Sequence, residues 1–220
     1  MWVTNQTRPD MAFETCAMSN QGKNPTVKKT IEANKAVRNL KNTNDVCIKF
    51  PSLGDPADIR VVAYGDGTHA SLADGSSQGG FMVFLSGGND NVAPVIWQSK
   101  KLDRVTKSPL ASETMALGET ADAGLMIASI VKEVYRLPHM PHVTCVTDSD
   151  SLYRNLRTSN TVTDMSMRVN VARLREMTDK GEITVKWVKS EEQLADSLTK
   201  RGASSEALVQ VLDAGKLKME

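Results

Sequence analysis

The apolar and polar positions follow a helical period in the first part of the chain and a mixed pattern after it. Residues 26–40 carry a broad apolar stripe, which predicts a helix: Val27, Ile31, Val37 and Leu40. Beyond residue 56, short β-branched runs predict strands, and longer runs at helical spacing separate them. The predicted strands cover residues 59–64, 81–85, 93–97, 143–147 and 183–188. The predicted helices cover residues 109–136, 152–156 and 166–178, and a last one starts at the capping pattern of residues 190–193. This order of elements predicts a mixed sheet with helices packed on it.

A stretch rich in proline and glycine, residues 51–56, separates the two patterns. Residues 1–56 contain eight Lys or Arg and five Asp or Glu, a net charge of +3. Residues 57–220 contain nineteen Lys or Arg and twenty-one Asp or Glu, a net charge of −2. We therefore predict three parts: a helical segment over residues 1–56, an α/β domain over residues 57–202, and a C-terminal helix or tail over residues 203–220.

The composition of the 220 residues narrows the class of protein. Charged residues make up 24% and apolar residues 40%, and the net charge of +1 excludes a strongly basic wrapper of nucleic acid. The three cysteines are far apart and match neither a disulfide framework nor a paired metal clip. No apolar run approaches the ~20 residues of a membrane span, and the first residues lack the pattern of a signal peptide. We expect an intracellular, reducing setting and no membrane.

Four acidic residues stand where strands are predicted to end or where a helix faces the sheet. Asp66 and Asp148 follow the first and fourth strands. Glu113 lies in the first turns of the long helix, and Asp196 lies in the last helix. Carboxylates gathered on the rim of a sheet are ligands for Mg²⁺ or Mn²⁺. Two such ions ~3.5–4 Å apart hydrolyse phosphodiesters, one activating water and the other stabilising the leaving oxygen.

Each of these residues also has an ordinary structural interpretation. Asp66 belongs to a turn signal, and on spacing alone a turn aspartate is the stronger interpretation. Asp148 and the residues after it are good helix caps, Glu113 suits the first turn of a helix, and Asp196 suits a solvated helix face. The metal site therefore depends on the four carboxylates meeting in the fold.

Five blocks of the α/β domain occur in a recognisable order. They are Tyr64-Gly65-Asp66-Gly67-Thr68, Val95-Ile96-Trp97-Gln98-Ser99-Lys100-Lys101, Leu110-Ala111-Ser112-Glu113, Thr147-Asp148-Ser149-Asp150-Ser151 and, as the most specific, Glu191-Glu192-Gln193-Leu194-Ala195-Asp196-Ser197-Leu198-Thr199-Lys200. Over residues 59–200 the chain resembles the RNase H domain of copia-type LTR retrotransposon Pol polyproteins. The resemblance implies an RNase H-like α/β fold, with a five-stranded mixed sheet in the order 3-2-1-4-5 and helices on both faces.

The same resemblance implies a function and a set of site residues. It implies a metal-dependent endonuclease that cleaves the RNA strand of an RNA–DNA hybrid. Two Mg²⁺ or Mn²⁺ ions would be held by the four carboxylates, Asp66, Glu113, Asp148 and Asp196. The candidates for substrate binding are basic residues before the long helix and one serine: Lys100, Lys101, Arg104, Lys107 and Ser149. A solvated loop is an equally good interpretation of the basic stretch.

The N-terminal segment resembles another part of the same polyproteins, the end of their reverse transcriptase. The matching blocks are Thr7-Arg8-Pro9-Asp10-Met11-Ala12-Phe13, Asn24-Pro25-Thr26 and Val37-Arg38-Asn39-Leu40-Lys41-Asn42-Thr43. The sequence contains no Tyr-x-Asp-Asp polymerase motif, so we expect a piece of a longer protein that does not polymerise by itself. The expected partners are the hybrid and the rest of the reverse transcriptase, in a cytoplasmic virus-like particle or the nucleus.

Some positions depart from the pattern of the family. Thr68 and His69 replace an aspartate and a tryptophan, and residues 163–167 replace a Lys-His-Ile-Asp-Ile block. A second interpretation is therefore a non-catalytic RNase H-like module that supports a polymerase or binds hybrid. An integrase or resolvase on the same fold is a third, but a glutamate on the long helix before Asp148 favours RNase H.

The remaining polar and aromatic candidates have structural interpretations. His69, His139 and His142 lack partners at metal-ligand spacing and are expected to be solvated. Trp97 and Trp187 fall on predicted strands and are expected in the core.

Overall fold

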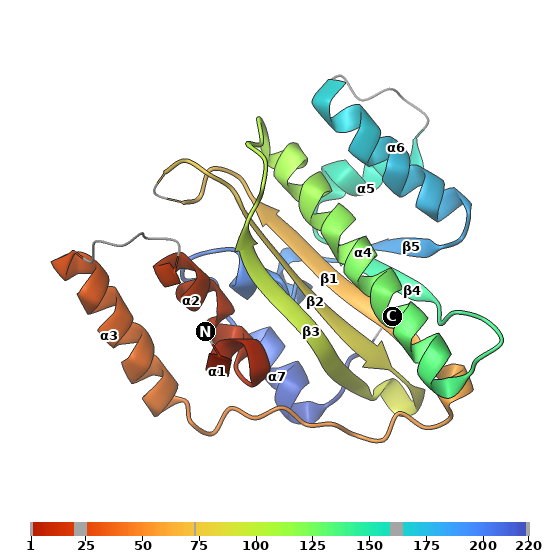
Figure 1. The fold of residues 1–220 in the computed structure, drawn as a ribbon, viewed down its shortest axis with the longest axis horizontal. Helices are drawn as coiled ribbons and strands as arrows, with labels where there is room; N and C mark the ends of the chain where they lie inside the picture. The colour runs from red at the N-terminus through yellow and green to blue at the C-terminus, as the bar shows by residue number, and fades with distance from the viewer. Residues whose placement is uncertain (1, 20–25, 73, 159–164, 219–220) are drawn as a thin grey trace.

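Five strands form one mixed sheet at the centre of the protein (Figure 1). The computed structural model describes residues 2–19, 26–72, 74–158 and 165–218. The strand order is β3-β2-β1-β4-β5, which confirms the predicted RNase H-like order. β1, β2 and β3 are antiparallel neighbours, whereas β4 is parallel to β1 and β5 is parallel to β4. The strands are β1 (Arg60–Thr68), β2 (Gln78–Ser86), β3 (Val92–Lys101), β4 (Val143–Thr147) and β5 (Ile183–Trp187).

Helices cover both faces of this sheet, as the resemblance predicted. One face carries α4 (Pro109–Tyr135), α5 (Asp150–Arg157) and α6 (Met165–Asp179). The other face carries α7 (Glu206–Ala214) and the 3-10 turn η5 (Asp196–Leu198). The other 3-10 turns are η1 (Pro9–Met11), η2 (Pro56–Asp58), η3 (Gly88–Asp90) and η4 (Ser190–Glu192).

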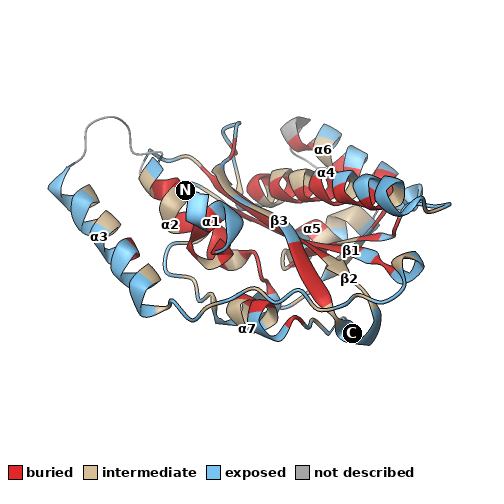
Figure 2. Cartoon of the chain, turned by 60° about the horizontal axis from the view of Figure 1, so that its bottom comes forward, coloured by how far each residue is buried: buried red, intermediate tan, exposed pale blue. Residues whose placement is uncertain are grey.

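The central strand β1 is buried on both faces because its apolar residues alternate between two cores. Val61 and Ala63 pack with α4, whereas Val62 and Tyr64 pack with η5 and α7. All four side chains are almost inaccessible to solvent. Figure 2 shows the buried strands and the buried side of α4. The carboxyl end of β1 therefore lies between two packed layers.

Helix α4 is the longest helix, and its sequence encodes both of its ends. The Ser108 hydroxyl caps the start by accepting from the Ala111 N–H at 3.2 Å, and Pro109 takes the first helical position. The helix ends where Arg136 adopts a left-handed conformation, close to the predicted end. By length and composition alone α4 is apolar enough to cross a membrane, but more than half of its most apolar stretch is buried in the protein. Such burial is typical of a core helix.

The N-terminal segment forms three helices, of which α1 (Trp2–Gln6) and α2 (Ala12–Ser19) lie beside β3 and α3 (Val27–Asn42) lies beyond them. Trp97 on β3 donates from its indole Nε1 to the Thr4 carbonyl at 2.8 Å. Residues 11–13 are buried. In contrast, α3 buries only Ala36 and is exposed along most of its length (Figure 2). Helix α2 is therefore a packed part of the protein, α1 is attached through its one buried residue, Thr4, and α3 stands out from the protein.

An extended strap, residues 44–55, connects α3 to the start of the sheet and passes α7. The Lys49 N–H donates to the Leu212 carbonyl at 2.9 Å. Ile48 packs on the core that α7 shares with the sheet. The domain boundary near residue 56 stays a prediction from the change in sequence pattern, because packing contacts continue across it.

Three strands are longer than the sequence predicts, and β2 (Gln78–Ser86) gains residues at both ends. β1 continues through Asp66 and ends at Thr68, so Asp66 lies within the strand instead of in a turn after it. β3 continues through Lys100 and Lys101, so these two lysines do not lie in a loop. The predictions ended the strands early because glycine and lysine are poor strand formers. Pairing with β2 along the whole length of β1 and β3 outweighs that local preference.

The helix predicted from residue 190 is absent, and η4 and η5 stand in its place. Gln193 lies between the two turns and is buried. Its side chain donates to the Gly65 carbonyl at 3.1 Å and accepts from the Ala195 N–H at 3.2 Å. These bonds hold the segment against β1 and compete with helical hydrogen bonds. Asp196 therefore stands on a 3-10 turn. Residues 163 and 164 of the divergent block lie outside the described residues.

Candidate metal centre

Two aspartates meet at the carboxyl ends of neighbouring parallel strands. β1 and β4 pair with Tyr64 opposite Val146. Two residues further along, Asp66 is fully buried within β1, and Asp148 is half-buried just after β4. Because parallel strands place equivalent residues side by side, this register brings the two carboxylates to one end of the sheet.

Glu113 reaches the same place from the first turns of α4. A Cβ on Gly67 would lie 2.4 Å from the Ser112 carbonyl oxygen, so the helix approaches β1 this closely only at a glycine. As a result Asp66, Glu113 and Asp148 each offer one oxygen, and these oxygens lie within 4.8 Å of one another. We call these three residues the carboxylate triad.

Two oxygens of the carboxylate triad are orphaned acceptors. Asp66 Oδ1 and Glu113 Oε2 are buried and accept no hydrogen bond from the part of the chain that the structure describes. Two other oxygens of the triad do accept hydrogen bonds. Asp66 Oδ2 accepts from the Thr199 hydroxyl, and Asp148 Oδ2 accepts from the Ser190 hydroxyl at 2.7 Å. Buried acceptors in native proteins nearly always have a partner. A bound cation would supply one.

Asp196 lies outside the carboxylate triad and is joined to it by a lysine. Lys200 Nζ lies 2.6 Å from Asp196 Oδ1 and 3.6 Å from Asp66 Oδ1. The Lys200 side chain is 37% exposed, whereas the Asp66 side chain is fully buried. The four predicted carboxylates thus gather at one place, but the structure separates them into a triad and an ion-paired fourth member.

Burial and like charge control the protonation of this site. Burial raises the pKa of Glu113 to about 9, and the charges of Asp66 and Asp148 add to the shift. Burial also raises the pKa of Asp66 to about 6, against the attraction of Lys200. The pKa of Asp196 is raised for the same first reason. Burial lowers the pKa of Lys200, but the charges of Asp66 and Asp196 outweigh burial and raise it. The site therefore favours added positive charge.

The donor set fits a hard divalent cation. The triad supplies carboxylate oxygens only and contains neither cysteine nor histidine. Carboxylates of this kind suit Mg²⁺ and Mn²⁺ better than Zn²⁺. Asp66, Glu113 and Asp148 would hold one such ion, and two of these residues carry a buried oxygen that lacks a hydrogen-bond donor among the described residues.

Two of the basic residues predicted to bind substrate are engaged in ion pairs. Lys100 lies 3.0 Å from Glu119 and 3.5 Å from Asp103. Lys101 lies 2.6 Å from Asp74. These ion pairs within the chain partly neutralise both lysines. A phosphate would therefore have to compete with the paired carboxylates for each lysine.

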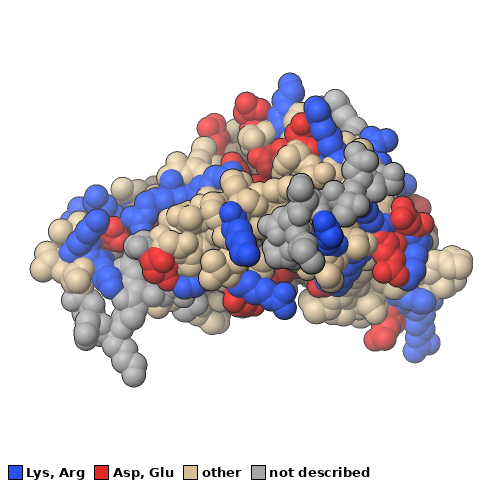
Figure 3. Space-filling model, turned by 90° about the horizontal axis from the view of Figure 1, so that it is seen from above, with Lys and Arg blue, Asp and Glu red and all other residues tan. Residues whose placement is uncertain are grey.

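The other two basic residues, Arg104 and Lys107, are exposed and form no ion pair with another described residue. The loop that carries them is anchored by Thr106, whose buried hydroxyl bonds with those of Ser77 at 2.6 Å and Ser112 at 2.8 Å. Ser112 lies in the first turn of α4, so the loop is held beside the helix that carries Glu113's carboxylate. In Figure 3, basic and acidic side chains are intermixed over the face seen from above.

Ser149 and His69 have structural partners in this region. The Ser149 hydroxyl caps α5 by accepting from the Leu152 N–H at 3.4 Å, which is one of the two interpretations that the sequence offered. His69 Nδ1 lies 3.1 Å from the Thr106 hydroxyl, so this histidine belongs to the anchored loop region. Trp187 is less buried than predicted, at 39% exposure, and donates from Nε1 to the Asp148 carbonyl at 3.0 Å.

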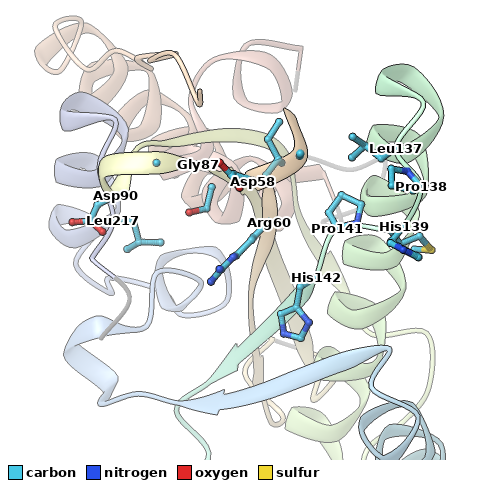
Figure 4. Close-up of a pocket in the computed structure, with 15 residues that line it drawn as sticks. Asp58, Arg60, Gly87, Asp90, Leu137, Pro138, His139, Pro141, His142 and Leu217 are labelled. Atoms are coloured by element: carbon cyan, nitrogen blue, oxygen red, sulfur yellow. The ribbon is translucent and has the colours of Figure 1, made fainter. Parts of the chain in front are cut away.

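A separate hollow of about 580 Å³ lies at the other end of β1 (Figure 4). Arg60, at the start of β1, lies on its wall together with His139 and His142. Both histidines are exposed, as predicted. The hollow is separated from Asp66 by the length of the strand and takes no part in the carboxylate site.

Sequence reasoning did not assign roles to Ser190, Thr199 and Lys200, which hold the carboxylates in place. Thr199 and Lys200 belong to the most specific of the matched blocks, so a signal was present. The spacing of four residues between Asp196 and Lys200 is the spacing at which side chains on one helical turn meet. The sequence pattern predicts a helix cap at Ser190, and local patterns carry no signal of its contact with Asp148, 42 positions away.

The curated relatives of the chain are proteins of retrotransposons, whereas no protein-family model matches it. The putative transposon Ty5-1 protein YCL074W of Saccharomyces cerevisiae is 29% identical over 110 residues, which are 50% of this chain and 33% of that protein. The Pol polyprotein from transposon RE2 of Arabidopsis thaliana is 27% identical over 199 residues, which are 88% of this chain and 13% of the polyprotein. The chain thus spans a minor part of either relative. The resemblance to retrotransposon Pol polyproteins is confirmed.

Solved structures that are similar to this chain include RNase H domains. The N-terminal RNase H domain of rv2228c from Mycobacterium tuberculosis has 15% identity and a TM-score of 0.46, over 71% of this chain and 96% of that one. RNase H1 from Halobacterium salinarum NRC-1 has 22% identity and a TM-score of 0.46, over 68% of this chain and 97% of that one. The fold of the present chain is identified by its own strand order, β3-β2-β1-β4-β5.

Proposed function

We propose that this chain is the RNase H portion of a copia-type retrotransposon Pol polyprotein, a metal-dependent endonuclease that hydrolyses the RNA strand of RNA–DNA hybrids. The observation that carries the proposal is the carboxylate triad. Its three residues offer oxygens within 4.8 Å of one another, and two of these residues have a buried oxygen without a hydrogen-bond donor among the described residues. The relatives among retrotransposon proteins support it. Lys200 and Asp196 complete the site.

The chain's own residues provide a prepared site for hydrolysis. When bound, two Mg²⁺ or Mn²⁺ ions supply an activated water and stabilise the leaving oxygen. Asp66, Glu113, Asp148 and Asp196 are the proposed ligands. The Thr199 and Ser190 hydroxyls orient the Asp66 and Asp148 carboxylates, since each donates to one carboxylate oxygen. The raised pKa of Glu113 means that its carboxyl keeps a proton near neutral pH until a cation takes that proton's place.

Substrate contact is proposed for the anchored loop beside α4. Arg104 and Lys107 are exposed and available for phosphate oxygens, and the Thr106 hydroxyl bonds keep the loop in place. Lys100 and Lys101 contribute to the positive potential, but each would have to leave an ion pair before it could bind a phosphate. Ser149 remains a candidate only through its half-buried position next to the triad, because its hydroxyl caps α5.

A second candidate function is a non-catalytic module that binds hybrid or supports a polymerase. The observation that favours it is the ion pair of Lys200 with Asp196, which places a positive charge among the proposed metal ligands. Thr68 and His69, at positions where the family has an aspartate and a tryptophan, point the same way.

The partners and the cellular setting follow from the same proposal. The rest of the reverse transcriptase in the same polyprotein is the proposed protein partner, next to α1, α2 and α3. An RNA–DNA hybrid is the proposed substrate, met inside the cell in a virus-like particle or in the nucleus. No membrane takes part in this proposal.

The test is a cleavage assay with a hybrid whose RNA strand is labelled at one end. The reactions contain Mg²⁺ or Mn²⁺, and parallel reactions contain duplex DNA or duplex RNA. We expect internal cuts in the RNA strand of the hybrid only. Tight binding of the hybrid without cuts, under conditions where a known ribonuclease H cuts it, would favour the non-catalytic module.

A further inference from the structure

We propose that the Lys200 ammonium occupies the second cation position of this site, between Asp196 and Asp66, so that one divalent cation binds readily and a second binds only when Lys200 moves away. The inference rests on the proposed function, because it concerns the same carboxylates. Its starting observation is the pair of distances from Lys200 Nζ, 2.6 Å to Asp196 Oδ1 and 3.6 Å to Asp66 Oδ1.

The four carboxylates are divided by geometry into two positions for positive charge. Asp66, Glu113 and Asp148 form the triad, with oxygens within 4.8 Å. Asp196 is not part of it and faces Lys200 instead. Asp66 is common to both positions, and its Oδ1 is buried without a hydrogen-bond donor among the described residues. The position at the triad thus offers oxygens that lack a hydrogen-bond donor, and the position between Asp66 and Asp196 is occupied by the Lys200 ammonium group.

The backbone around η5 keeps Lys200 at this position. The Lys200 and Thr199 N–H groups both donate to the Asp196 carbonyl, at 3.0 and 3.1 Å. The same short turn therefore fixes Asp196, the Thr199 hydroxyl that bonds Asp66, and the start of the lysine side chain. The turn itself is held to the sheet, because the Ser99 hydroxyl on β3 donates to the Leu198 carbonyl at 2.6 Å.

The ammonium group can leave this position without unfolding the turn. Lys200 has a flexible stem of four carbons, and 37% of the side chain is exposed. A divalent cation between Asp66 and Asp196 would stand close to the ammonium, and like charges at that distance repel strongly in a partly buried site. Binding of a second cation therefore has to include the outward movement of Lys200. The first cation, on the triad, does not require it.

Direct measurement of Mn²⁺ binding to the full chain, without nucleic acid, tests this order. We expect the parent protein to bind one Mn²⁺ and then a second at least tenfold more weakly. Lys200→Met removes the competing charge, so its second binding step should tighten at least tenfold while the first changes less. Lys200→Arg keeps a cation and should stay within about threefold of the parent. Arg201→Met is the matched control, because it removes one positive charge from the next residue, which pairs with Glu32 rather than with the carboxylates.

A second measurement uses the parent protein alone. Acylation of Lys200 by an amine-reactive reagent, followed by mass spectrometry, should be slow in chelator and rise severalfold at Mg²⁺ concentrations above saturation of the first step. Lys180, which pairs with Glu176 on the surface, is the internal reference. An unchanged or weaker second step in folded Lys200→Met overturns the proposal, as does acylation of Lys200 that ignores Mg²⁺. Failure of hybrid cleavage alone would count against the proposed nuclease function. The cation-binding and acylation results would still decide the proposal on Lys200, because neither measurement uses nucleic acid.

Discussion

Gly65 and Thr120 share one space between β1 and α4: a Cβ on Gly65 would lie 2.0 Å from Thr120 Oγ1 and 2.9 Å from Thr120 Cβ. Thr120 is fully buried, and its hydroxyl donates to the Ala116 carbonyl at 2.7 Å. The central strand and the long helix therefore meet at the residue before Asp66. This contact ties the stability of the fold to the position of the carboxylate.

We expect Gly65→Ala to lower the free energy of unfolding by about 1–3 kcal/mol, because the new methyl group overpacks the contact with Thr120. Thr120→Ala in the same chain should restore part of the loss, giving a coupling of about 0.5–3 kcal/mol in a double-mutant cycle. Urea unfolding followed by circular dichroism measures all four proteins. Gly118→Ala is the control on α4, since nothing lies within 4 Å of its Cβ, and it should be neutral or stabilising. Additive effects at positions 65 and 120 would contradict the shared space.

Asp148→Asn should lower the rate of hybrid cleavage at least a hundredfold and leave the fold intact. Changing residues that orient metal ligands reduces activity about 10–100-fold, and a direct ligand should lose no less. Ser190→Ala, which removes only the hydrogen bond to Asp148 Oδ2, should lose about tenfold. Stability in chelator should stay equal or rise in Asp148→Asn, since one of several repelling charges is removed. Cleavage by Asp148→Asn at the parent rate would show that this carboxylate is no ligand.

Cleavage should require Mg²⁺ or Mn²⁺ and stop in chelator, because only carboxylate oxygens form the triad. Ca²⁺ should bind yet support little turnover, since its larger and more flexible coordination misplaces the reacting water. Titration of each ion in the hybrid assay, together with binding by calorimetry, separates these effects. Full activity in excess chelator would contradict the proposed use of metal ions.

In chelator, the free energy of unfolding should fall as the pH rises from about 4.5 to about 9. The folded protein keeps a proton on Glu113 up to its pKa of about 9, whereas the unfolded chain loses it near 4.5, so folding is favoured at the lower pH. Asp66 adds to the same trend up to its pKa of about 6. Unfolding in urea at several pH values checks it. Glu113→Gln should flatten the dependence above pH 6, and an unchanged slope in that variant would argue against the raised pKa.

The exposed helix α3 should contribute to hybrid affinity through Lys28 and Lys35, which are exposed and form no ion pair with another described residue. Basic side chains gather over the α3 end of the molecule in Figure 3. Changing both lysines to Gln should flatten the slope of log affinity against log salt by roughly 0.9 per lost phosphate contact. Lys216→Gln with Lys218→Gln, after α7, is the matched control, because both of these lysines are exposed as well. Equal slopes for the two double variants would indicate that α3 serves only to contact protein.

Replacing these charges is preferable to deleting the N-terminal segment. Residues 11–13 are buried, and Trp97 on β3 donates to the Thr4 carbonyl. Ile48 packs on the same core as α7. Removal of residues 1–56 would therefore expose part of the core, and a loss of affinity would not report on phosphate contacts alone.

Local sequence determined the features whose causes lie within a few residues. Ser108 and Pro109 set the start of α4, and the β-branched residues of 143–147 define β4 at its observed bounds. The four carboxylates proposed as metal ligands were also named from the sequence, through the matched blocks that contain them. The strand order followed from the same resemblance rather than from the residues' own pattern.

Tertiary structure alone decided how the carboxylates are arranged. The register of β1 and β4 places Asp66 beside Asp148, and Gly67 lets α4 bring Glu113 to them. Buried Gln193 turns an expected helix into two 3-10 turns, and this puts Lys200 between Asp196 and Asp66. Apart from the pair of Lys200 with Asp196, these contacts join residues more than 40 positions apart. Periodicity and spacing report which face a residue takes, but they carry no information on which distant atoms meet there.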